Sequence, residues 1–156
     1  MSDTDIALDE FCALRELTLD LLISLSKREL EIPSIGNVSP LWKQFRHIVR
    51  VQENYTEAIQ TGVIVFDPHR GTCASDRSKA SLLAYFESAQ DSMISALKAS
   101  TEQTRVDWFG EPCSVATHLG RLSNHESLHH GMFILQARER IMTLPPSWSL
   151  WGEHDA

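Results

Sequence analysis

Three histidines in this sequence have the type and spacing of a metal-binding site. His125 and His129 are four residues apart in a segment with helical periodicity, which places their Cβ atoms about 6 Å apart on one helix face. Because a metal–nitrogen bond is about 2.0–2.1 Å long, both imidazoles can reach one ion. A third ligand has to come from another segment, and His47 flanks the apolar stripe of an earlier predicted helix. Three protein ligands leave a coordination position open, as a catalytic metal ion requires.

The same stretch also matches a sharper motif. Residues 125–129 read HESLH, the HExxH pattern in which both histidines bind zinc and the glutamate, here Glu126, is the general base of a metalloprotease. The pattern fixes only three positions, and no extended substrate-binding strand or convincing downstream acidic ligand accompanies it. On a helical wheel Glu126 also lies close to the core direction. A zinc hydrolase is therefore the disfavoured alternative to a simple three-histidine site.

Three more residues are candidates for supporting roles. His118 precedes His125 by one heptad and is a candidate general base or a partner of a metal ligand, and a partly exposed helix histidine explains it equally well. Tyr55 follows His47 by two turns and is either a residue that contacts a cofactor or a core aromatic. His130 falls on the opposite flank of the core stripe from the metal candidates, and its role stays open.

Four segments with helical periodicity must position these side chains, and no segment alternates like a strand. Their ends carry capping residues and helix breakers. The expected helices run from about Thr4 to Arg28, from Ser39 (N-cap) and Pro40 to Gly62, from Asp76 or Ser78 to about Leu97, and from Ser114 (N-cap, after Pro112) to about Met142. The tail after Met142, which contains Trp148 and Trp151, has no predicted helix.

Four amphipathic helices bury their apolar faces most simply in an all-α four-helix bundle. We expect one such domain over residues 1–156. The connection from Gly62 to about Arg77 can span about 50 Å when extended, against about 33 Å for a 22-residue helix. This length permits a crossover that leaves the second and third helices parallel.

The composition argues against several classes of partner. The net charge is −7, from 14 basic and 21 acidic residues, so the average field repels nucleic acid. The apolar runs are too short for a membrane span, and the amino terminus does not resemble a signal peptide. The scattered cysteines Cys12, Cys73 and Cys113 are typical of reduced thiols. We therefore expect a cytoplasmic protein that binds neither nucleic acid nor membranes.

Three stretches of the chain resemble the DinB-like family of metal-dependent four-helix proteins. They are FRHIVRVQENYTEAIQTG in the second predicted helix, THLGRLSNHESLHHGMFILQARE in the fourth, and the tail LPPSWSLWG. The middle stretch is similar to the family pattern HxxxHRGQ. This sequence has His130-Gly131-Met132 where the family usually has Arg-Gly-Gln, so it lacks an arginine and a glutamine near the site.

The resemblance implies that His47, His125 and His129 bind a zinc or nickel ion in a bundle of up-down-down-up order. It also implies frequent homodimers and a small-molecule substrate. Relatives with assigned activities include S-transferases and a maleylpyruvate isomerase that use low-molecular-weight thiols such as bacillithiol or mycothiol. We therefore expect a metal-dependent thiol S-transferase or related enzyme. The alternatives are a non-enzymatic, stress-related metal-binding dimer and the HExxH hydrolase.

Overall fold

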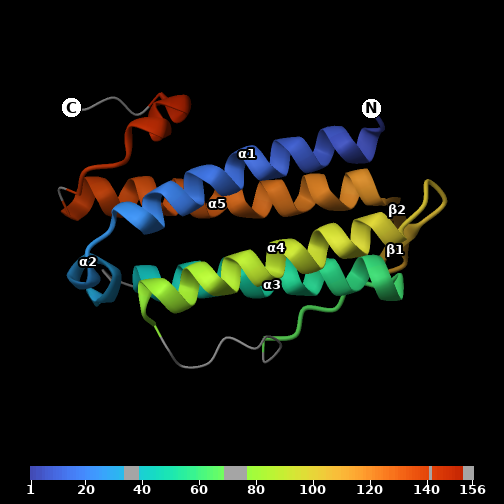
Figure 1. The fold of residues 1–156 in the computed structure, drawn as a ribbon, viewed down its shortest axis with the longest axis horizontal. Coiled ribbons are helices and arrows are strands. Elements are labelled where there is room, and N and C mark those ends of the chain that lie inside the picture. The colour runs from blue at the N-terminus through green and yellow to red at the C-terminus, as the bar shows by residue number, and fades with distance from the viewer. Residues whose placement is uncertain (34–38, 69–76, 141, 153–156) are drawn as a thin grey trace.

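Four long helices dominate the structure, a computed structural model that describes residues 1–33, 39–68, 77–140 and 142–152. They pack side by side as a bundle, which confirms the expected fold class (Figure 1). The long helices are α1 (Asp3–Ser24), α3 (Leu41–Thr61), α4 (Lys79–Ala99) and α5 (Val115–Arg140).

The helices follow the predicted up-down-down-up order. In Figure 1, α1 and α5 run in one direction, whereas α3 and α4 run in the other, so α3 ends and α4 begins at opposite ends of the bundle. Hydrogen bonds agree with this order: Lys79 Nζ at the start of α4 donates to the carbonyl of Ile23 at the end of α1, over 2.7 Å. The neighbours α3 and α5 are therefore antiparallel, and His47 faces α5 across a helix pair.

The first predicted helix is wrong at its end, because the chain breaks at Leu25 instead of continuing to Arg28. Helix α1 stops at Ser24, and a short helix α2 (Lys27–Glu31) follows at an angle to it (Figure 1). Ser26 caps α2 through a capping box, in which its hydroxyl accepts from the Glu29 N–H and the Glu29 carboxylate accepts from the Ser26 N–H. This local motif ends the helical run although the apolar periodicity continues.

The other helix ends lie close to the predicted positions. Helix α3 begins at Leu41 with Pro40, rather than Ser39, at the N-cap and without a side-chain cap, and Gly62 closes it in the left-handed region at φ 81°. Ser78 caps α4, whereas the alternative start Asp76 lies outside the described residues. The Ser114 hydroxyl accepts from the Thr117 N–H at 3.2 Å, as expected of a cap for α5.

A β-hairpin between α4 and α5 contradicts the expectation of a strand-free chain. Strands β1 (Arg105–Trp108) and β2 (Glu111–Ser114) pair antiparallel, and Phe109 and Gly110 turn between them with positive φ. The Asp107 carboxylate accepts from the Gly110 N–H at 2.8 Å and stabilises the turn. Val63 bridges to Asp107, so the hairpin also holds the end of α3. Four-residue strands are too short to show a clear alternation.

The C-terminal tail also differs from its prediction. Residues Pro146–Trp151 form a 3₁₀ helix, η1, which lies against the outer side of α1 (Figure 1). Trp148 is completely buried, and its indole N–H donates to the carbonyl of Leu17 at 2.9 Å. The tail is therefore part of the folded core at the end of the bundle near α2.

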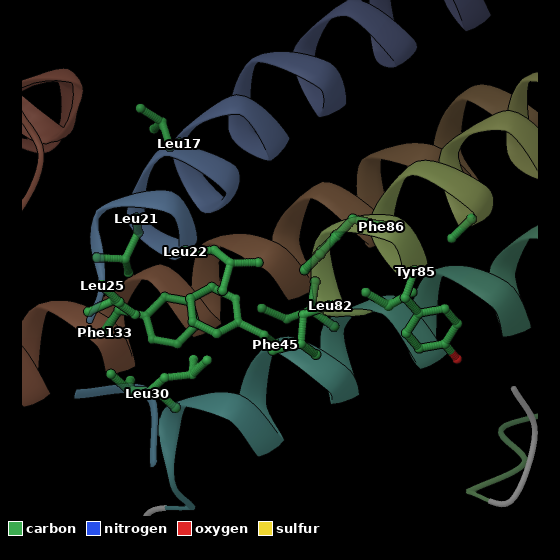
Figure 2. Close-up of a cluster of buried hydrophobic side chains, with 14 of the residues drawn as sticks. Leu17, Leu21, Leu22, Leu25, Leu30, Phe45, Leu82, Tyr85, Phe86 and Phe133 are labelled. Carbon is green, nitrogen blue, oxygen red and sulfur yellow. The ribbon is translucent and has the colours of Figure 1, made fainter. Parts of the chain in front are cut away.

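The core has two apolar clusters, one near α2 and one near the hairpin. Figure 2 shows the first, in which side chains from α1, α3, α4 and α5 converge. Phe45 of α3 stacks on Phe133 of α5 with ring centroids 4.9 Å apart and meets Phe86 of α4 edge-on at 6.4 Å. A layer of buried polar side chains separates the clusters, and it consists of Arg15, Thr18, Gln52, Glu126 and His130.

Two further sequence expectations concern membranes and thiols. None of the described helices is long and apolar enough to cross a membrane. Cys12 and Cys113 are free thiols, as predicted, and Cys73 lies outside the described residues.

We predict that Trp148→Ala destabilises the bundle by about 3–5 kcal/mol, because it empties a fully buried site and removes the bond to Leu17. Urea denaturation followed by circular dichroism measures this change. Leu150→Ala is the control, since Leu150 is 68% exposed in the same 3₁₀ helix and its loss should cost less than about 0.5 kcal/mol. Equal stabilities of the two variants would contradict a docked tail.

Candidate metal centre

The structure brings His47, His125 and His129 together between α3 and α5. Their ligand atoms all lie within 4.8 Å of one another, and the Nε2 atoms of His47 and His125 are 3.2 Å apart. Ring centroids are 5.2 Å apart from His47 to each of the other two, and 4.8 Å between His125 and His129. Among the described residues, this is the group of histidine, cysteine and acidic side chains that could hold a metal ion.

The dimensions of the cluster fit a divalent ion. With bonds of about 2.0–2.1 Å, two ligand nitrogens of a tetrahedral ion lie about 3.3–3.4 Å apart. The His47–His125 separation of 3.2 Å is close to that value. His129 is buried, His125 is half-buried and His47 is exposed, so the cluster opens toward solvent on the α3 side. The three side chains could therefore hold one metal ion.

The histidines are neutral at physiological pH, as metal ligands must be. Burial lowers the pKa of His125 to about 4 and that of His129 to about 3, and the neighbouring imidazoles add to both shifts. Partial burial lowers the pKa of His47, and the positive charge of Arg50 lowers it further. The site therefore offers three lone pairs and no proton that a metal ion must displace near pH 7.

Glu126 lies between two of these histidines in sequence, but its carboxylate belongs to a different part of the molecule. Its oxygens accept from Arg15 Nε and Nη2, both at 2.8 Å, and the Thr18 hydroxyl donates to it at 2.5 Å. Burial alone would raise the pKa of Glu126, but the charge and hydrogen bonds of Arg15 and the Thr18 hydroxyl outweigh it, and the pKa is lowered.

This pairing bears directly on the HExxH alternative. A general base for a metal-bound water needs a carboxylate with free access to that water. Glu126 is fully buried and bound on both oxygens by a cation on α1, so the geometry gives no support to a protease mechanism. Its observed role is to tie α5 to α1.

His130 also faces α1, away from the metal cluster, as its place on the helical wheel indicates. Its Nε2 lies 2.7 Å from the Thr18 hydroxyl, and its Nδ1 accepts from the Trp151 indole N–H at 3.2 Å. Because the Thr18 proton goes to Glu126, the Nε2 of His130 has to be the donor in that contact. His130 therefore connects the C-terminal tail to the buried polar layer.

His118 and Tyr55 lie near the hairpin rather than at the cluster. His118 is fully buried, accepts from the Trp108 indole at 3.0 Å and contacts the carbonyl of Tyr55 at 2.9 Å, so both ring nitrogens are engaged. The Tyr55 ring packs 4.5 Å from that of His118, and burial raises its pKa to about 12. The expectation of a partly exposed His118 is therefore wrong, whereas the packing of Tyr55 agrees with a core aromatic. The predicted site roles of both residues have no geometric support.

The sequence analysis missed the residues that contact Glu126 and one residue near His47. Arg15 and Thr18 lie in α1, more than a hundred positions before Glu126, and no local sequence pattern assigns them a contact with it. Arg50, one turn after His47, was also missed. Its spacing from His47 is a usable signal, because residues three apart on a helix are neighbours.

The fold and cluster together define a four-helix bundle with a histidine site between two antiparallel helices. The sequence model of the DinB superfamily matches residues 10–133, which include α1 from Glu10 onward, all of α3 and α4, α5 as far as Phe133, and all three histidines. The chain therefore belongs to the DinB superfamily, as the sequence resemblance indicated. A search of curated proteins finds no match to this chain.

We predict that Glu126→Gln lowers the free energy of unfolding by about 3–5 kcal/mol, because it leaves the buried Arg15 charge uncompensated. The double variant Arg15→Met, Glu126→Leu should be less destabilised, since it buries no lone charge. Urea denaturation gives both values, with Glu139→Gln, an exposed substitution on the same helix, as the control. A Glu126→Gln protein with parental stability would refute the anchoring role.

Proposed function

We propose that the three-histidine cluster binds one zinc or nickel ion, and that the protein uses this site to transfer a small-molecule thiol to an electrophile. The observation that carries the proposal is the convergence of three neutral imidazoles from α3 and α5 within 4.8 Å. Membership of the DinB superfamily supports it. When bound, the ion would supply Lewis-acid chemistry that lowers the pKa of a coordinated thiol.

The chain's own residues define what such a reaction requires. The exposed side of His47 admits a small molecule to the cluster, while burial of His129 limits water on the inner side. In the transfer itself, the thiol sulfur forms a bond to an electrophilic carbon, the leaving group departs with its bonding pair, and the thiol proton passes to solvent. Among the described residues, no free carboxylate contacts the cluster to act as base, so a thiol activated at the metal is favoured over a metal-activated water.

Metal content is the first test of this proposal. We expect about one equivalent of zinc or nickel in the purified, untagged protein and a loss of at least about tenfold in affinity in His47→Ala, which removes one ligand. His47 is exposed, so this variant should fold. Lys43→Ala, exposed one turn earlier on α3, is the matched control and should keep its metal. Parent protein that takes up neither metal would refute the site.

Thiol transfer is tested with a chromogenic electrophile such as 1-chloro-2,4-dinitrobenzene and a panel of low-molecular-weight thiols. We expect consumption above the uncatalysed rate only when thiol, protein and metal are all present, and a loss of that rate in His47→Ala. One equivalent of bound metal without any transfer would favour the non-enzymatic alternative. Chelator-sensitive cleavage of casein by the parent protein would instead favour the hydrolase.

A further inference from the structure

Arg50 on α3 and Arg121 on α5 flank the metal cluster on the same side. Arg50 follows His47 by three residues and Arg121 precedes His125 by four, which is about 4.5 Å and about 6 Å along the helix axes. Because α3 runs toward the hairpin and α5 runs away from it, both steps lead toward the hairpin (Figure 1). On each helix the arginine also lies within about 60° of the histidine's direction. Both therefore lie about one turn beyond the cluster.

Neither of these guanidinium groups has an acidic partner in the described part of the chain. The ion pair found there lies in the buried polar layer. Arg50 is half-buried, and its Nε is buried without a hydrogen-bond partner. Arg121 is also half-buried, with its guanidinium carbon 4.4 Å from the Trp108 ring centroid and Nη1 3.9 Å from Cys113 Sγ. These contacts hold Arg121 in place but leave its charge uncompensated, so an anion bound there would be stabilised.

A divalent ion bound at the cluster would add to the positive charge of the two arginines. Three neutral imidazoles contribute no negative charge, so a bound divalent ion keeps its full charge. Glu126, the acidic side chain that influences the pKa values of His125 and His129, is already paired with Arg15. A protein of net charge −7 therefore has two arginines without an acidic partner between the cluster and the hairpin. Such a pair of arginines attracts and orients anionic ligands.

We propose that Arg50 and Arg121 bind the carboxylate of a small acid whose other end, a thiol, reaches the metal position. This inference rests on the proposed function and names the substrate class: a short thiol-bearing carboxylate rather than a neutral thiol. Arginine suits the task because its planar fork donates two parallel hydrogen bonds to one carboxylate. The separation of about one helical turn between the cluster and the arginines sets the length of the acid.

The test is calorimetric titration of the metal-loaded protein with 3-mercaptopropionate and with its neutral amide, 3-mercaptopropionamide. The two probes share the thiol and the chain length and differ only in charge. We expect the acid to bind about tenfold more tightly than the amide at low salt, and the difference to shrink as salt screens the arginines. Equal affinities would overturn the proposal.

Three arginine variants distinguish direct contact between an arginine and the carboxylate from a general effect of the protein's net charge. Arg50→Gln should weaken the acid about tenfold and Arg121→Gln about threefold, and neither should change the affinity of the amide. Arg46→Gln is the matched control, because Arg46 is next to His47 in sequence but lies over the Trp42 ring at 4.9 Å. An equal loss in Arg46→Gln would show a long-range effect of net charge and refute the contact.

A second pair of probes separates this inference from the thiol chemistry. A hydroxamate that carries a carboxylate, and its carboxamide analogue, bind a divalent ion without a thiol. If the hydroxamates bind with a preference for the acid and neither thiol binds, the arginine site is supported and thiol binding is refuted. Thiol binding without preference in either pair would support the proposed function and refute the arginine site. Absence of binding by all four probes would reject both.

Discussion

The buried ion pair between Arg15 and Glu126 is the contact on which the arrangement of the three-histidine cluster depends. A bidentate bond at 2.8 Å fixes the rotation of α5 about its axis relative to α1. Glu126 is adjacent to His125 and three residues before His129, so with the carboxylate turned toward α1 both imidazoles face α3. An apolar residue at this position would be compatible with several rotations of α5 about its axis. A buried charge is compatible only with the rotations that keep its partner within hydrogen-bond distance.

The two apolar clusters hold the helices together, and the polar layer between them determines their register. Thr18, Gln52 and His130 complete the hydrogen bonds of the ion pair, and His130 extends them to Trp151 in the tail. Arg15 also lies over the Phe86 ring at 4.7 Å, so the cation is enclosed by both polar and aromatic groups. The three histidines lie just outside this layer, with His129 buried and His47 exposed to solvent. This position combines side chains held by a rigid interior with exposure on the α3 side.

The sequence predicts the features that follow from a local pattern. It does not predict the role of a residue whose contact partner lies far away in the chain. Periodicity and capping residues predicted the four long helices. The histidine cluster was predicted from the spacing of His125 and His129 and from the single histidine, His47, on another helix, and the structure brings these three residues together. The break at Ser26 was visible as a Ser-x-x-Glu capping box, but continuing apolar periodicity concealed it. The role of Glu126 was not predictable, because its partner Arg15 is 111 positions away. The hairpin strands are too short for a periodic signal.

X-ray absorption spectroscopy of the zinc-loaded protein, compared with His47→Ala, tests most directly whether the three histidines bind one metal ion. We expect three imidazole nitrogens at about 2.0–2.1 Å and one further ligand that the protein does not supply. In His47→Ala one imidazole should be lost from the coordination shell, since His47 is the ligand that α3 contributes. A shell with sulfur at about 2.3 Å from Cys12 or Cys113, or one unchanged by the substitution, would contradict a metal centre between α3 and α5.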